Sequence, residues 1–226
     1  VVYLLGKDGK PLWESQQATV PLQAHIAEDG NFVAVGTEGG KLLLLNSDQS
    51  EIASRQFNAP IIHLDVSADG ELMLAALQEE ENKNTLVVLD KMGEVLWQRQ
   101  TGSILEAKIA GADKRVIVNW LEDDTYYLGA FSATGETLWE LKQHSMLSLD
   151  KSGEIIISVK DKAINCYDEN AQEIWDVNVS GEISRVYVSD NGSHLAAIMT
   201  DPNTQRQTLL YFDMDGNQLW EMPLPV

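Results

Sequence analysis

The sequence predicts an all-β chain folded as a β-propeller of four-stranded antiparallel blades. One observation is a turn that leads into an apolar residue and a tryptophan, which recurs along almost the whole chain. A second is an Asp-Gly turn, or a close variant, midway between successive copies. Short alternating apolar runs flank both turns, as in hairpins. Two hairpins per repeat make four strands, which is typical of a propeller blade.

The tryptophan element comes first along the chain. With Ala53 taken as the position where the tryptophan is lost, its copies are 40, 44, 42, 36 and 45 residues apart. A tryptophan buries ~200 Å² and can anchor one sheet against the next, so we expect packing between blades rather than an aromatic ligand cage. We expect Trp120, outside this column, to pack as well. The tryptophans in the column are Trp13, Trp97, Trp139, Trp175 and Trp220.

The midway turns divide the chain into blades. These turns are Glu28-Asp29-Gly30, Ala68-Asp69-Gly70, Ala112-Asp113-Lys114, Lys151-Ser152-Gly153 and Asp190-Asn191-Gly192. We expect one propeller domain over residues 1–226, with six blades, or seven as the alternative. Residues 1–17 would form only the last two strands of the opening blade, whose first two strands lie upstream of Val1 or are missing. The five full blades are predicted at 18–57, 58–101, 102–142, 143–180 and 181–226.

Two segments, 86–97 and 211–220, resemble the pyrroloquinoline-quinone-like repeat: an apolar strand, Asp, a turn with Gly, then Leu-Trp. The Asp-Gly hairpins are more similar to WD-repeat-like propellers. The resemblance implies a propeller but not an activity. Quinone-dependent dehydrogenases of this family have a vicinal cysteine pair and a calcium site, whereas this chain has the single Cys166. We therefore expect a non-catalytic member without a cofactor. Such repeats often lie outside the cytoplasmic membrane, so we expect an extracytoplasmic (periplasmic or cell-surface) location, with a cytoplasmic one left open.

Charge and motifs exclude several function classes. The chain has 16 basic and 35 acidic residues, a formal charge of −19, which disfavours nucleic-acid phosphates and anionic membranes. No apolar run approaches the ~18 residues that span a bilayer; an upstream anchor stays open. We find no catalytic motif and expect no enzyme. The segment 213–216 looks like a calcium loop but lacks its later ligands, so we interpret it as a turn.

The innermost strand of each blade supplies two columns of mainly polar residues that alternate with apolar ones. In a propeller such residues surround the axial channel. They are candidates for binding a small molecule or an ion; the alternative is a water-filled channel whose charges satisfy one another. We predict no metal site. The candidates are Gln23, His25, His63, Asp65, Glu106, Lys108, Arg185 and Tyr187, with Met146 and Ser148 at the equivalent positions of the blade predicted at 143–180.

Acidic residues also gather in the turns predicted between the second and third strands. A negative rim would suit a basic protein or peptide partner, although solvated charge is the alternative. The sequence thus favours a non-catalytic interaction or scaffold propeller that binds through a loop face; the alternative is a ligand-sensing propeller. The acidic loop residues are Glu79, Glu80, Glu81, Glu122, Asp123, Asp124 and Asp201.

Overall fold

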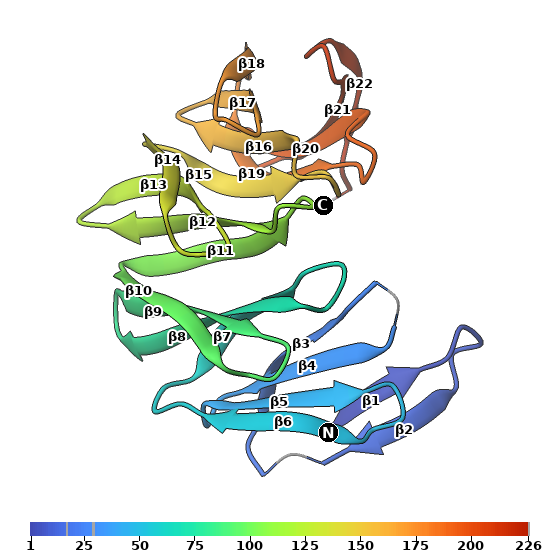
Figure 1. Cartoon of the computed structure of the whole chain (residues 1–226). Coiled ribbons are helices and arrows are strands. Elements are labelled where there is room, and N and C mark those ends of the chain that lie inside the picture. Colours follow the sequence, from blue (N-terminus) through green and yellow to red (C-terminus); the bar gives the residue numbers. More distant parts are fainter. Residues whose placement is uncertain (17, 29, 226) are drawn as a thin grey trace. The chain divides into compact units, whose positions relative to one another are not determined.

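The computed structural model describes residues 1–16, 18–28 and 30–225. Within these residues the secondary structure consists of strands β1 to β22, without a helix (Figure 1). All strand pairings are antiparallel between neighbours in the sequence, as the hairpin pattern predicts. Tertiary contacts divide the chain into two compact units, Val1–Ile109 and Ala110–Val226, and the boundary lies inside β11. The single domain stays a prediction, and each unit is described by itself.

The first unit contains a two-stranded sheet followed by two four-stranded sheets (Figure 1). The two-stranded sheet is the predicted partial blade, β1 (Val2–Leu5) and β2 (Pro11–Ser15). The next sheet consists of β3 (Pro21–Ile26), β4 (Phe32–Thr37), β5 (Lys41–Asn46) and β6 (Glu51–Gln56). The third consists of β7 (Ile61–Val66), β8 (Leu72–Glu80), β9 (Lys83–Asp90) and β10 (Val95–Thr101).

The remaining three sheets are also four-stranded. The first consists of β11 (Ser103–Ala110), β12 (Arg115–Glu122), β13 (Thr125–Phe131) and β14 (Thr137–Lys142). The second consists of β15 (Ser145–Leu149), β16 (Ile155–Lys160), β17 (Ala163–Asp168) and β18 (Glu173–Asn178). The last consists of β19 (Glu182–Val188), β20 (His194–Thr200), β21 (Gln207–Asp213) and β22 (Gln218–Pro223).

The turns form because an Asp or Ser side chain holds the backbone that follows it. The carboxylate of Asp213 accepts hydrogen bonds from the amides of Asp215 and Asn217, at 3.1 and 2.9 Å. Asp90 and Asp168 bind the amides two and four residues later in the same way. The side-chain amide of Asn217 also donates to Asp213, at 3.1 Å, and this bond together with the backbone bonds lowers the pKa of Asp213. The bonds confirm that segment 213–216 is a turn.

Glycine closes the inner hairpins where the chain must turn with positive φ. Gly70 and Gly153 both have φ of +70°, which a side chain would strain. At Gly153 a Cβ would also lie 2.6 Å from the Cβ of Ala110, so the inner strands of neighbouring sheets approach closely there. Asp29, in the first of the predicted turns, lies outside the described residues.

In the first unit the apolar faces of successive sheets pack on one another. One core lies between the β3–β6 and β7–β10 sheets and includes Leu44, Leu64, Met73 and Leu89, all at most 5% exposed. A smaller core joins the two-stranded sheet to the next one: Val2, Leu4 and Trp13 pack on Val33, Val35, Leu43 and Leu45. Burial of these side chains stabilises the unit by ~25 cal/mol per Å² of apolar surface.

The second unit repeats this arrangement with two cores. One contains Ile117, Leu128 and Ile156, with the partly buried Trp139 packed against it. The other contains Ile164, Leu195 and Phe212, with Trp175 packed against it. The pattern of apolar residues thus places the tryptophan of one sheet on the face of the next, as the sequence predicts.

A repeated hydrogen bond fixes these tryptophans. The indole N–H of Trp139 donates to the carbonyl of Glu169 at 3.0 Å, in the turn between β17 and β18. The indole of Trp175 donates to the carbonyl of Met214 at 2.8 Å, in the turn between β21 and β22. The indole of Trp13 donates to the carbonyl of Ser47 at 2.9 Å, in the turn between β5 and β6. Each bond joins one sheet to the next within its unit, so the packing interpretation is confirmed for these three. Trp220 is 44% exposed and stacks on Tyr211.

Trp120 packs within its own sheet and is 3% exposed. Its ring stacks on that of Tyr127 with 5.2 Å between centroids, and its indole donates to Glu122 at 3.2 Å. The prediction of packing is confirmed here too. None of the described residues forms a helix long and apolar enough to cross a membrane.

Candidate functional site

Three inner strands of the first unit meet through one carboxylate. Asp65 on β7 is 4% exposed. One of its oxygens lies 3.0 Å from Nε2 of His25 on β3, and the other accepts the amide of Ile109 on β11 at 2.7 Å. Two residues of the predicted columns are therefore bonded to each other, and Asp65 joins the inner strands of three successive sheets.

His63, Glu106 and Lys108 form the second polar group of the first unit. Lys108 and Glu106 alternate on β11 and form an ion pair of 3.4 Å between half-exposed side chains. Burial lowers the pKa of His63, and the charge of Glu106 opposes this shift. Because a neutral imidazole is favoured there, His63 is suited to accept or donate a hydrogen bond near neutral pH.

The equivalent inner-strand positions of the second unit make similar bonds. The hydroxyl of Ser148 on β15 accepts the amide of Val188 on β19 at 2.9 Å, the counterpart of the bond from Ile109 to Asp65. Arg185 and Tyr187 are exposed and lie on β19, where the guanidinium donates to the phenol at 3.4 Å. Among the described residues, no group of three or more His, Cys, Asp and Glu side chains is placed to hold a metal ion.

The apolar residues predicted to pack between blades are buried in β7, where Asp65 is buried as well, but the prediction is wrong for β3. Leu64 and Val66 of β7 are 5% and 6% exposed, whereas Ile26, the counterpart of Val66, is 46% exposed, and Gln23 and His25 are the half-buried residues. The physical reason is that the sheet preceding β3 has only its two outer strands. None of the described residues therefore covers the apolar face of β3 as the β3–β6 sheet covers that of β7.

The acidic hairpin between β8 and β9 projects into solvent. Glu79, Glu80 and Glu81 are all exposed, and Lys83 lies 3.8 Å from Glu80. Glu79 also lines a groove of about 670 Å³ between the β3–β6 and β7–β10 sheets. Apolar residues (Phe57, Ala59, Leu77, Val95) and the amide side chains Gln56, Asn58, Gln98 and Gln100 line this groove, together with Arg55 and Thr85.

In the second unit the predicted acidic loops are also exposed turns. Asp123 and Asp124 form the tip of the β12–β13 hairpin, with positive φ of 48° and 58°. Glu122 precedes them and accepts the indole N–H of Trp120. The carboxylate of Asp201 binds the amides of Thr204 and Asn203, which lowers its pKa, so this residue caps a turn.

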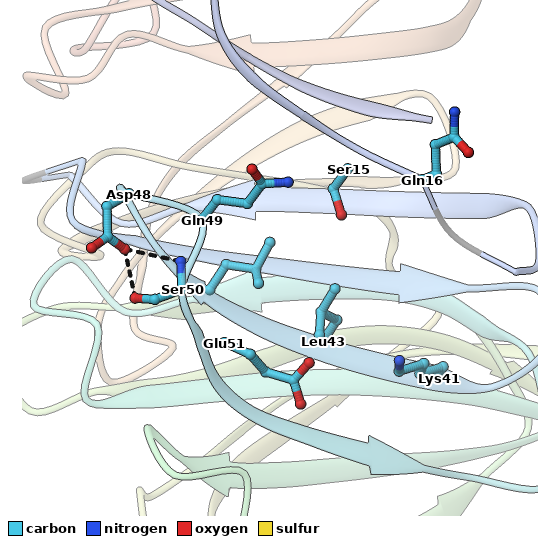
Figure 2. Close-up of a pocket in the computed structure, with 9 residues that line it drawn as sticks. Ser15, Gln16, Lys41, Leu43, Asp48, Gln49, Ser50 and Glu51 are labelled. Carbon is cyan, nitrogen blue, oxygen red and sulfur yellow. Dashed lines mark hydrogen bonds between the residues drawn. The ribbon is translucent and has the colours of Figure 1, made fainter.

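A second cleft, of about 520 Å³, lies between the two-stranded sheet and β5–β6 (Figure 2). Figure 2 shows that Asp48 points at Ser50, which donates to it through both its amide and its hydroxyl. Gln49 donates to the carbonyl of Glu14 at 2.6 Å. The bond from Gln49 joins the two sheets at this cleft, and those of Ser50 hold the turn beside it, which favours a structural role.

Sequence reasoning missed a buried histidine in the second unit. His144 is 3% exposed and meets the ring of Tyr167 edge-on, with 5.4 Å between centroids. Burial, reinforced by the charge of Lys160, lowers its pKa to about 4. Burial also raises the pKa of Tyr167 to about 12. His144 lies just before the inner strand β15, outside the alternating columns, so the pattern did not include it.

Replacement of His144 by Phe should flatten the pH dependence of stability. The unfolded chain binds a proton below the ordinary pKa of 6.5, whereas the folded chain stays neutral at His144 down to about 4. Stability from this site is therefore present above pH 6.5 and is lost as pH falls to 4, by up to ~3 kcal/mol. Urea unfolding of both proteins at pH 7 and 4.5 checks this; parallel pH profiles would contradict it.

Residues 1–125, more than half of the chain, match the model of a family described as a family of unknown function, DUF5711. The chain belongs to this family. No curated protein matches the sequence.

Solved structures place the fold of this DUF5711 member among the β-propellers. The Dos1 propeller superposes with a TM-score of 0.66 at 14% identity, over 99% of this chain and 62% of that one. The propeller domain of Myceliophteria thermophila Cps50 (Swd1) superposes with a TM-score of 0.64 at 15% identity, over 88% of this chain and 68% of that one. A chain of the mitotic checkpoint complex superposes with a TM-score of 0.70 at 11% identity, over 99% of this chain and 72% of that one. The chain thus spans less than two thirds of the Dos1 propeller, and the all-β propeller prediction is confirmed.

Proposed function

We propose that this protein is a non-catalytic interaction propeller that binds a basic polypeptide segment at the β8–β9 hairpin. The observation that carries the proposal is the position of Glu79, which belongs to the exposed acidic hairpin and also lines the groove of about 670 Å³. One propeller neighbour is a chain of the mitotic checkpoint complex, a protein assembly, which agrees with this proposal. The extracytoplasmic location and the type of repeat stay predictions.

The groove offers separate contacts to the side chains and the backbone of an extended segment. Its apolar lining, Phe57, Leu77 and Val95, suits an aliphatic side chain. Gln98 and Gln100, exposed on β10, offer amides that can both donate to and accept from a peptide backbone. Arg55 is held by the carbonyl of Gly93 and by Glu94, which leaves the glutamates of the hairpin to attract a basic residue.

Neutralising the hairpin should weaken binding of a fluorescein-labelled lysine-rich peptide. We expect the triple variant Glu79→Gln, Glu80→Gln, Glu81→Gln to raise the Kd, measured by fluorescence anisotropy, roughly fivefold or more at low salt. The difference should shrink at 300 mM salt, about twice physiological ionic strength, because salt screens exposed charges.

The matched control removes three exposed carboxylates elsewhere, by Glu136→Gln, Glu140→Gln and Glu154→Gln. Both variants lose the same charge, so net attraction alone predicts equal changes in Kd. A Kd that rises only for the hairpin variant supports the site. Equal rises would contradict it.

A second candidate function, binding of a small ligand beside the inner strands, is favoured by one observation. Nδ1 of His25 is buried and has no hydrogen-bond partner among the described residues, although Nε2 is paired with Asp65. Such an atom can bind a ligand or an ordered water. A small molecule that raises the Tm of the wild type but not of His25→Phe would support this function.

A further inference from the structure

A buried hydroxyl in the groove beside the acidic hairpin has no hydrogen-bond partner among the described residues. It belongs to Thr85 on β9, which lines the groove and is 5% exposed. A buried polar group without a partner destabilises a fold, and a valine there would have the same shape without this cost. Rotation about the Cα–Cβ bond can turn the hydroxyl toward a ligand in the groove. The hydroxyl therefore points to a binding role.

The register of the strands places other groove residues around Thr85. Leu77 of β8 lies directly opposite it on one side, and Gln100 of β10 on the other. Residues directly opposite each other share one face of the sheet, and all three line the groove. Glu79 follows Leu77 by two residues on β8 and lines the groove as well. An apolar side chain, a hydroxyl and a carboxylate thus lie along one stretch of the groove.

These groups suit a lysine side chain better than an arginine. A lysine has a flexible aliphatic stem, which can cover Leu77, and a compact ammonium with three donors. The ammonium can donate to the carboxylate of Glu79 and to the hydroxyl oxygen of Thr85 together, because these oxygens belong to neighbouring strands. The planar guanidinium of arginine instead matches the two oxygens of a single carboxylate or phosphate.

We propose that the groove binds a lysine side chain of the basic segment, and that Thr85 is the residue that selects lysine. This inference rests on the proposed function and adds its specificity. The lysine stem packs on Leu77, and the ammonium binds Glu79 and Thr85. The exposed amide of Gln100 holds the peptide backbone beside it. The occupant is an extended, lysine-containing segment of another protein, because a cation complements the charge of the acidic hairpin.

Thr85→Val removes the hydroxyl with little change of shape and tests the proposal in two ways. The Kd for the fluorescein-labelled lysine-rich peptide should rise about tenfold, because the ammonium loses one acceptor. The Tm should rise by ~2–4 °C, because a buried unsatisfied hydroxyl is removed. Thr85→Ser retains the hydroxyl and should keep the Kd within about threefold of the wild-type value.

The matched control is Thr101→Val on β10, which changes a threonine of similar exposure (6% against 5%). The hydroxyl of Thr101 donates to the carbonyl of Gly102 at 3.0 Å, so its removal leaves that carbonyl without the donor. Thr101 is not one of the described residues that line the groove. This variant should therefore lower the Tm and leave the Kd unchanged.

A second peptide, with every lysine replaced by arginine, keeps the charge and tests the selection. Thr85→Val should raise the Kd about tenfold for the lysine peptide but less than about twofold for the arginine peptide. Equal losses for both peptides, an unchanged Kd for the lysine peptide or a lowered Tm would overturn the proposal. If the triple glutamine variant of the hairpin weakens binding but Thr85→Val does not, this inference fails and the proposed function stands. A wild type that does not bind the lysine peptide would overturn both.

Discussion

Trp139→Ala should destabilise the protein by ~3–5 kcal/mol, as for other aromatic large-to-small changes in packed sites. The change removes the ring that packs on the core of the second unit. It also leaves the carbonyl of Glu169 without the indole donor. Chemical denaturation monitored by circular dichroism measures the loss.

Two variants separate the causes of that loss. Trp139→Phe retains most of the apolar contact but removes the hydrogen bond, so its loss should lie near ~1 kcal/mol. Trp220→Ala is the matched control, since Trp220 holds the same place in its repeat but is 44% exposed. A loss under ~1 kcal/mol for Trp139→Ala, or equal losses for Trp139 and Trp220, would show that this tryptophan does not join sheets.

Asp65→Ala should cost ~2–4 kcal/mol, the second-largest effect we expect. Removal of the carboxylate leaves the amide of Ile109 without its acceptor, and each buried unsatisfied group costs ~1–3 kcal/mol. It also removes the partner of His25. The free energy of unfolding in urea gives the loss, and exchange at the Ile109 amide should speed up.

Asp65→Asn tests whether the acceptor or the charge matters, because the amide oxygen can still accept from Ile109. This variant should retain more stability than Asp65→Ala. Ser148→Ala, which removes the equivalent acceptor for Val188 in the second unit, should cost ~1 kcal/mol. If Asp65→Ala were as stable as the wild type, the carboxylate would not join the inner strands, and a role in ligand binding would gain weight.

The sequence patterns predicted the sheets well because turn chemistry is local. The Asp that binds the amides two and four residues later, as at Asp213, and the glycines with positive φ mark many of the hairpins in the sequence itself. The tryptophan column also marked the packing faces, since its period equals that of the sheets.

The candidate site was less predictable because its geometry depends on neighbouring strands. Alternation identified Asp65 and His25 as members of one column, but only the structure shows that they bind each other. It also failed on β3, where exposure depends on a missing neighbour rather than on the residues of the strand. The groove beside Glu79 draws on segments 55–59 and 77–100, and no local pattern brings these together.

The proposed interaction is tested most directly by hydrogen exchange of the whole chain with and without the lysine-rich peptide. The account predicts slower exchange in the β8–β9 hairpin around Glu79–Glu81 and in segment 55–59, which lines the groove together with Glu79. Exchange in the inner strands β3, β7 and β11 should not change. Protection confined to those inner strands, around His25 and Asp65, or no protection at all, would contradict it.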